Sequence, residues 1–139
     1  MSGALARPLI AAVPVLGLLQ GCLPGERLTL PAERTSRRDL RVWTVEARDV
    51  GDGILVHGVV RGSPFALGII PGHLHVGARL KDGSRTRIVE TRWGSMSGGQ
   101  SRMADFYATL PIADASTVAA VAVSYVPGSD DAPQSDTVQ

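Results

Sequence analysis

The residues best suited to chemistry are two histidines in the segment His73-Leu74-His75. On a β-strand, side chains two positions apart project from the same face, with Cα atoms about 6.6 Å apart. Two such imidazoles can share a zinc or copper ion when one or two further ligands complete the site. The candidates for those ligands are His57, Asp105 and, for the softer copper ion, the thioethers of Met96 and Met103. Because His-x-His pairs are common by chance and the alternation with Leu74 and Val76 leaves both histidines on a polar face, the sequence favours ordinary surface histidines and keeps metal binding as the alternative.

No other group of residues has the pattern of a catalytic site. The glycine-rich segment Gly94 to Gly99 lacks the lysine and the Ser/Thr ending of a phosphate-binding loop, so we predict a hairpin loop there. Ser95 and Ser97 have no nucleophile elbow around them, which leaves a hydrolase only as an alternative. The single cysteine, Cys22, excludes an intrachain disulfide and a cysteine-based zinc site. We therefore expect a protein that is not an enzyme.

Cys22 directly follows a segment with the properties of a secretion signal. Arg7 is the only charged residue before Glu26, and residues 9–19 are almost wholly apolar. This apolar run is shorter than the roughly 20 residues that a membrane-spanning helix needs. We expect residues 1–21 to be a signal peptide that is removed from the mature chain.

The sequence Leu19-Gln20-Gly21-Cys22 resembles the lipobox of bacterial lipoproteins, in which an apolar, a variable and a small residue precede the modified cysteine. The resemblance implies that Leu19 to Gly21 hold the cleavage site and that the Cys22 thiol carries a diacylglycerol. Two or more acyl chains give stable membrane attachment. In this family an aspartate after the cysteine often marks retention at the inner membrane. Leu23 stands there instead, which implies an outer-membrane location facing the periplasm.

The charge balance excludes one class of partner. Lys and Arg total 14 and Asp and Glu total 13, so loss of Arg7 with the signal leaves a mature chain without net charge. Such a balanced surface gives no reason to expect a nucleic acid as the partner. The excess of Arg over Lys accompanies frequent Ala, Gly and Pro, a composition typical of GC-rich genomes, and is weak evidence for anion binding.

The elements that must position these residues are short strands separated by turn-forming residues. The predicted strands cover residues 40–48, 53–61, 73–80, 85–93, 105–110 and 117–126, and an apolar connection covers residues 65–70. Asp82-Gly83 predicts a tight hairpin turn. Trp43 and Phe106 have inward-facing positions, whereas Trp93, beside the glycine-rich loop, is a candidate contact for a partner. Six or seven such strands predict an all-β, antiparallel, immunoglobulin-like sandwich, with a small open β-barrel as the alternative.

The predicted organisation has four parts. Residues 1–21 are the signal peptide, residues 22–39 a lipidated tether, residues 40–127 the β-sandwich domain and residues 128–139 a disordered tail. The pattern around His73 to Val76 and Lys81 to Gly83 is also similar to that of uncharacterised periplasmic sandwich lipoproteins. We expect a membrane-anchored envelope lipoprotein whose non-catalytic domain binds another envelope protein or stabilises an assembly. The alternative is a periplasmic zinc- or copper-binding protein.

Overall fold

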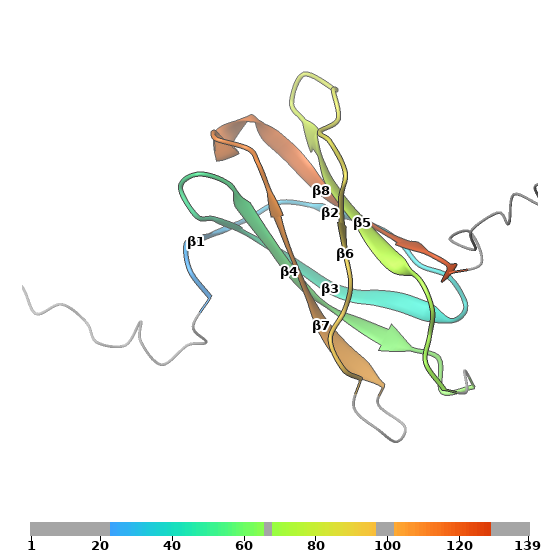
Figure 1. The fold of residues 1–139 in the computed structure, drawn as a ribbon. Coiled ribbons are helices and arrows are strands. Elements are labelled where there is room, and N and C mark those ends of the chain that lie inside the picture. Colours follow the sequence, from blue (N-terminus) through green and yellow to red (C-terminus); the bar gives the residue numbers. More distant parts are fainter. Residues whose placement is uncertain (1–22, 66–67, 97–101, 129–139) are drawn as a thin grey trace, which may run out of the picture.

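The chain folds into two four-stranded β-sheets that form a sandwich (Figure 1). This architecture comes from a computed structural model, which describes residues 23–65, 68–96 and 102–128. The first sheet has the order β1-β3-β4-β7 and the second has the order β2-β8-β5-β6. The elements are β1 (Glu26–Leu28), β2 (Ala32–Thr35), β3 (Leu40–Asp49), β4 (Ile54–Gly62), β5 (His73–Leu80), β6 (Val89–Thr91), β7 (Met103–Leu110), the 3-10 helix η2 (Ala115–Thr117) and β8 (Val118–Val126). The predicted sandwich is confirmed, and the sheets do not close into a barrel.

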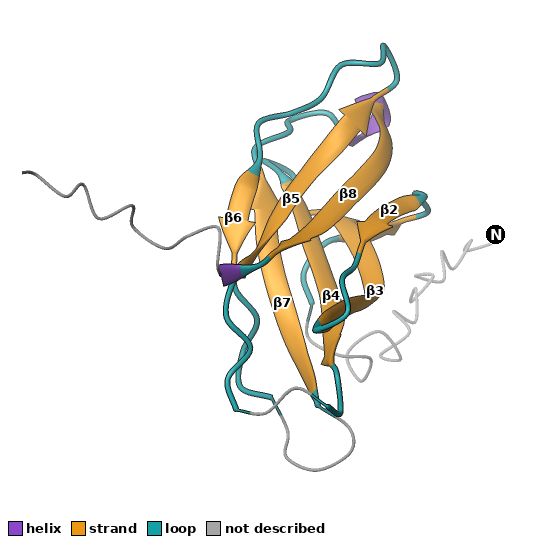
Figure 2. Cartoon of the chain, turned by 90° about the vertical axis from the view of Figure 1, so that its right-hand side faces the viewer, coloured by secondary structure: helices purple, strands orange, loops and turns teal. Residues whose placement is uncertain are grey.

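Strands make up nearly all of the regular structure in the described residues, as Figure 2 shows in orange. In this part of the chain, no helix is long and apolar enough to cross a membrane. The two sheets approach each other at the edge formed by β6 and β7. There an isolated bridge joins Trp93 to Phe106, and the Gly94 amide donates to the Asp105 carbonyl at 2.9 Å.

The predicted tether over residues 22–39 is corrected, because two strands form within it. β1 pairs antiparallel with the far end of β3, and β2 pairs parallel with β8, the only parallel pair among the described strands. Both strands lie at sheet edges and leave most of their side chains exposed. They are held by main-chain hydrogen bonds, with Leu28 and Leu30 packed against the core, so they need no alternation of apolar and polar residues. The folded domain therefore begins near Glu26.

A β-bulge in β3 overturns the predicted inward position of Trp43. β3 and β4 pair antiparallel, and their register shifts between Val42 and Thr44. Val42 faces the core before the bulge and Ala47 does so after it, whereas Trp43 is 44% exposed. The extra residue of the bulge resets the alternation of faces, which a strict two-residue period does not anticipate.

The hairpin after β5 has the predicted turn but a shorter return strand. Gly83 has a φ of +89°, the conformation for which a glycine is suited, and the Gly83 amide donates to the Leu80 carbonyl at 2.9 Å. Only Val89–Thr91 of the predicted strand 85–93 forms a regular ladder with β5. The Ala78 amide donates to the Thr86 hydroxyl at 2.9 Å instead of to a main-chain carbonyl, so the ladder is interrupted between the turn and β6.

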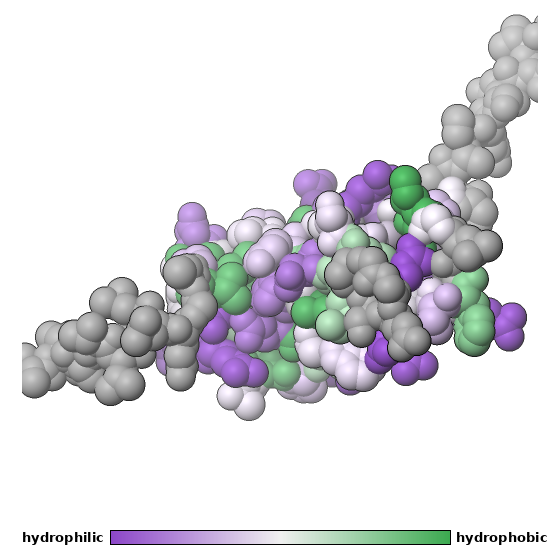
Figure 3. Space-filling model, turned by 90° about the horizontal axis from the view of Figure 1, so that it is seen from below, coloured by the Kyte–Doolittle hydropathy of each residue, from purple (hydrophilic) through white to green (hydrophobic). Residues whose placement is uncertain are grey.

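The hydrophobic core lies between the sheets. Phe106 is its largest fully buried side chain, as its inward position predicts, and β8 lies inside the second sheet, between β2 and β5. The other fully buried large side chains are Leu40, Ile54, Val56, Val60, Leu74, Val76, Leu110, Val118, Val121 and Val123. On the face shown in Figure 3, hydrophobic residues (green) form separate patches among hydrophilic ones (purple). Most of the large apolar side chains are thus buried between the two sheets, away from water.

Candidate metal centre

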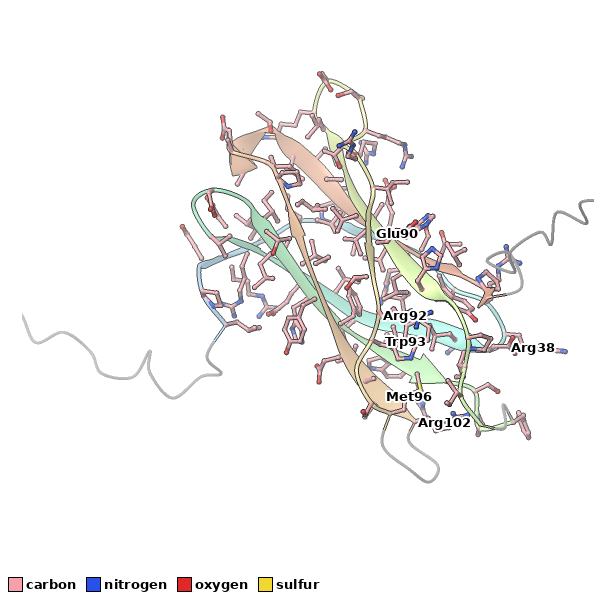
Figure 4. The ribbon with its side chains drawn as sticks, in the orientation of Figure 1. Arg38, Glu90, Arg92, Trp93, Met96 and Arg102 are labelled. Atoms are coloured by element: carbon pink, nitrogen blue, oxygen red, sulfur yellow. The ribbon has the colours of Figure 1, made fainter. Side chains whose placement is uncertain are left out.

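Three potential metal ligands meet on the outer face of the second sheet. Leu74 and Val76 of β5 are buried, so the alternating side chains of His73 and His75 project away from the core. β6 runs antiparallel to β5 and places Glu90 directly opposite His75. Glu90 is labelled in Figure 4. We call His73, His75 and Glu90 the His-His-Glu group. It is the only group of three or more such ligands that converge within the described residues.

The spacing within the His-His-Glu group fits one ion. The Nε2 atoms of His73 and His75 are 2.9 Å apart. The Glu90 Oε1 atom lies 3.4 Å from the His75 Nε2 and 3.8 Å from the His73 Nε2. Ligand atoms around a tetrahedral zinc ion at about 2.0–2.1 Å are separated by roughly 3.3–3.4 Å. The three separations bracket this value, so small side-chain movements are enough to put all three atoms on one ion.

The group is sheltered on one side and open on the other. The His73 side chain is 12% exposed, that of His75 33% and that of Glu90 70%. A shallow hollow of about 440 Å³ lies beside them, lined by His73, Glu90, Thr91 and Arg92. An ion held here would keep at least one coordination position toward this hollow. Because Arg92 brings a positive charge to the hollow, that position would favour an anionic exogenous ligand.

The structure corrects the predicted third ligand. His57 lies on β4 in the first sheet, not beside the histidines of β5. Its Nε2 atom is 3.0 Å from Asp105 Oδ1, its Nδ1 atom is 3.6 Å from Glu46 Oε1, and its ring stacks on Tyr107 with centroids 4.7 Å apart. The carboxylates lie at opposite nitrogens of the ring, so this arrangement supports ion pairing and does not bring three ligand atoms together. His57 and Asp105 are therefore not ligands of the predicted site.

Glu46, one of these partners, has a pKa below its ordinary 4.5. Partial burial acts to raise the pKa. The hydrogen bond that Arg48 donates at 3.2 Å, together with the positive charges of Arg48, Arg27 and a protonated His57, outweighs it. The carboxylate thus stays ionised to lower pH than an isolated glutamate does.

The thioethers predicted as soft copper ligands are elsewhere. Met96 lines a groove next to Trp93, and Met103 begins β7 in the first sheet. Neither lines the hollow at the His-His-Glu group. The structure thus offers nitrogen and oxygen ligands at this position, which suit zinc better than monovalent copper.

The sequence-based prediction did not include Glu90, because the register of the hairpin changes between its turn and β6. At the turn the Leu80 amide donates to the Ser84 carbonyl at 2.8 Å, and Arg79 faces Arg85. Continuing this register would place Val89 opposite His75, but the structure pairs Val76 with Val89 and His75 with Glu90. The turn signal in the sequence therefore brings Glu90 near the two histidines but does not by itself place it opposite His75.

Trp93 lies where a ligand could reach it. It lines a groove of about 800 Å³, the Trp93 groove, and its ring packs edge-on against Tyr125 with centroids 6.0 Å apart. The lining residues are Gly68, Ile69, Ile70, Pro71, Gly72, Arg92, Trp93, Gly94, Ser95, Met96 and Arg102. Arg102 donates a hydrogen bond to the Gly68 carbonyl and so ties two segments of the wall together. Ser95 is in this wall without a histidine or carboxylate among the lining residues, so it has no partner for a catalytic triad there.

Several predictions concern residues outside the described ranges. They are the signal peptide and Cys22 in residues 1–22, Ser97 and Gly99 in the glycine-rich loop, and the tail beyond Gly128. Comparisons with protein families, with characterised proteins and with solved structures find no match to this chain. The function is therefore proposed from the residues and their geometry.

Proposed function

We propose that this chain is a membrane-anchored lipoprotein of the bacterial envelope whose β-sandwich binds a divalent metal ion, zinc before copper, at His73, His75 and Glu90. The observation that carries the proposal is the convergence of two imidazole nitrogens and a carboxylate oxygen within 4.8 Å of one another. The anchor is proposed from the lipobox-like sequence that ends at Cys22.

The ligand set favours zinc. Two neutral imidazoles and one carboxylate, with a position left for water or another ligand, form a recurrent zinc coordination. The strands β5 and β6 hold the three residues in register, so little ordering is needed before the ion binds. The hollow beside the ion is shallow, and Glu90 is mostly exposed, so the ion is accessible for exchange. Binding or transfer of the metal fits this geometry better than an enzymatic reaction, which needs a cleft that excludes water.

Zinc titration of the mature chain tests the metal site. At 100 times its dissociation constant, zinc is expected to stabilise the folded protein by about 2.7 kcal/mol, measured as a shift of the unfolding midpoint. The double substitution His73→Gln and His75→Gln should remove this shift, and Glu90→Gln should weaken zinc binding in calorimetry. The matched control is His57→Gln, which changes a histidine on the other sheet and should keep the full shift. A zinc-induced shift that persists in the double variant, or none in the wild type, would refute the site.

Acidification provides a second readout of the same site. Both imidazoles must be neutral to ligate, so zinc binding releases protons and weakens as the pH falls. The proton release, measured by calorimetry in buffers of different ionisation enthalpy, should disappear in the double histidine variant. An unchanged proton release in that variant would assign zinc binding to other residues.

A second candidate function is the binding of an envelope protein in the Trp93 groove. The observation that favours it is Ile69, an apolar residue that is 95% exposed and lines this groove together with Trp93. Exposed apolar residues beside a groove are typical of protein contacts. A photo-crosslinking residue at position 69 should capture a defined partner in cells, whereas the same residue at position 88, where Ile88 is also exposed, should not. Equal capture at both positions, or none, would argue against this surface.

A further inference from the structure

A second cleft, lined by arginines, lies at the opposite end of β3 from β1. Its volume is about 610 Å³ and its lining residues are Ser36, Arg37, Arg38, Arg41, Arg61, Gly62, Ser63, Pro64 and Phe65. We call it the arginine cleft. It has four arginines and no carboxylate among its lining residues. β1 pairs with β3 at residues 47–49, and Figure 4 shows Arg38 at the other side of the domain.

The strand register places two of these arginines in direct opposition. Arg41 of β3 and Arg61 of β4 are register partners in the antiparallel pair. Like charges directly opposite each other destabilise a sheet. An arginine-rich composition can explain how many arginines the chain has, but it does not explain why they gather at one cleft. An anion between the two guanidinium groups would attract both of them and so offset the repulsion between them.

Four arginines elsewhere in the described domain, namely Arg27, Arg48, Arg79 and Arg85, have acidic partners, whereas none of the cleft arginines does. Arg48 lies 3.2 Å from Glu46 and Arg79 lies 3.0 Å from Glu33. Within the described ranges, no carboxylate forms an ion pair with any arginine of the cleft. Asp39 is the nearest acidic residue in sequence, and it lines an adjoining hollow with Arg38, Ser63 and Phe65. One carboxylate beside four guanidinium groups leaves the cleft strongly positive.

The cleft is held in shape before any ligand binds. The Ser63 amide donates to the Asp39 carbonyl at 2.9 Å, which joins the segment before β3 to the segment after β4. The Val42 amide donates to the Ser36 hydroxyl at 3.0 Å. The guanidinium of Arg61 lies 5.3 Å from the centre of the Trp43 ring, a cation-π contact that orients it.

An aromatic ring lies at the same cleft. Phe65 is 90% exposed, so its ring is available to pack against a flat or apolar part of a ligand. Guanidinium groups bind phosphate through paired N–H donors, and several of them can share the oxygens of one phosphate. The arginines and Phe65 together suit a ligand that carries both a phosphate group and a flat or apolar group.

We propose that the arginine cleft binds a phosphate ester, with the phosphate between Arg41 and Arg61 and the apolar portion against Phe65. This goes beyond the proposed metal function and shares no residue with it. The same phosphate chemistry occurs in a soluble metabolite and in a lipid head group. The position of the cleft, remote from β1 and from the lipid expected at Cys22, favours the soluble source.

The test uses the mature chain and three probes, namely inorganic phosphate, phenyl phosphate, and vesicles of phosphatidylglycerol in phosphatidylcholine. Phenyl phosphate should bind more tightly than inorganic phosphate, and Arg41→Gln should weaken its binding about tenfold or more through the loss of a charge-assisted contact. The matched control is Arg87→Gln, which removes an exposed arginine outside the cleft and should leave the affinity unchanged. Phe65→Ala should reduce the preference for phenyl phosphate over inorganic phosphate.

Each other result has a defined meaning. Equal weakening by Arg87→Gln and Arg41→Gln would overturn the proposal, because binding would then depend only on net charge. Benzoate binding as tightly as phenyl phosphate would overturn the choice of phosphate over carboxylate. Binding to the vesicles that Arg41→Gln abolishes, without binding of phenyl phosphate, would keep the phosphate site and overturn the soluble source. Arg41→Gln should be at least as stable as the wild type without ligand, because it removes the repulsion across the strands.

Discussion

Two glycines of the sandwich should respond in opposite ways to the addition of one methyl group. A Cβ atom at Gly58 in β4 would lie 2.1 Å from the Thr44 carbonyl oxygen and 2.6 Å from two ring carbons of Phe106. Phe106 is fully buried, and the carbonyl belongs to the bulged strand β3, so neither neighbour can move freely. A Cβ atom at Gly77 in β5 would meet nothing closer than the Thr86 hydroxyl at 3.6 Å, an ordinary contact.

The expected difference is large enough for a simple measurement. Overpacking a core lowers the free energy of unfolding by about 1–3 kcal/mol, and Gly58→Ala should reach the upper end because its contacts include main-chain atoms. Each kcal/mol shifts the melting temperature of a domain of this size by roughly 4–8 °C, so a loss of about 3 kcal/mol should lower it by about 12–24 °C. Gly77→Ala should be neutral or stabilise by about 0.4–1 kcal/mol, because alanine restricts the unfolded chain.

Urea unfolding followed by tryptophan fluorescence provides the free energies, and a double-mutant cycle identifies the cause. Phe106→Leu in the Gly58→Ala background should recover part of the loss, since the smaller side chain removes the ring contact. The carbonyl contact of Thr44 remains, so recovery should be incomplete. Variants Gly58→Ala and Gly77→Ala with stabilities within about 0.5 kcal/mol of each other would refute this packing of β4 against Phe106.

Four further features each allow a direct test. They are the N-terminal strands, the tyrosine of β8, the partly buried carboxylate of Glu46 in β3 and the cysteine before the domain. Removal of residues 23–39 should lower the unfolding free energy in urea by about 2–4 kcal/mol, because it deletes β1 and β2 with their two packed leucines. An equally stable truncated domain would argue against both strands. Burial, then the charge of Asp39, raises the pKa of Tyr125 above 10.0, so the stability tied to its neutral form is present below pH 10 and is lost as the pH rises through the raised pKa. Tyr125→Phe should flatten this alkaline limb and lower the unfolding free energy by about 1 kcal/mol through the lost hydrogen bond, and an unchanged limb would contradict this. Glu46 makes stability depend on pH in the opposite direction. Its lowered pKa gives stability that is present above pH 4.5 and is lost as the pH falls through the lowered value. Glu46→Gln should therefore flatten the acid side of the plot of urea midpoint against pH. Cys22→Ser should abolish labelling by a fatty-acid analogue, and label retained on this variant would end the lipoprotein proposal.

The long strands could be predicted because their burial follows the sequence pattern. β5 has the predicted bounds, and β3, β4 and β8 differ from their predictions by a residue or two. β1 and β2 could not be found in this way, since short edge strands with exposed side chains carry no alternation. The inward position predicted for Trp43 is wrong for a different reason: a bulge depends on the pairing with the neighbouring strand and does not change the local two-residue period.

The candidate sites show the same division between local and cross-strand information. His73 and His75 are two residues apart in one strand, so their common face follows from sequence spacing. Glu90 joins them only through the register of the hairpin. The arginine cleft depends on the opposition of Arg41 and Arg61 across two strands, and this opposition is not visible in the local sequence around either residue.

Because β1 begins close to Cys22 in the sequence, it limits how far the folded domain of an anchored chain could lie from the membrane. β1 begins at Glu26, so only Leu23, Pro24 and Gly25 separate it from Cys22. An extended residue spans about 3.3–3.6 Å, which limits this connection to roughly 14 Å. A chain lipidated at Cys22 would therefore hold its folded domain close to the bilayer surface, with little reach away from it, and its partners would have to diffuse to it. Along β3, the residues that pair with β1 lie roughly 20–26 Å from Arg41 of the arginine cleft, so the cleft can face the aqueous compartment well clear of the lipid head groups.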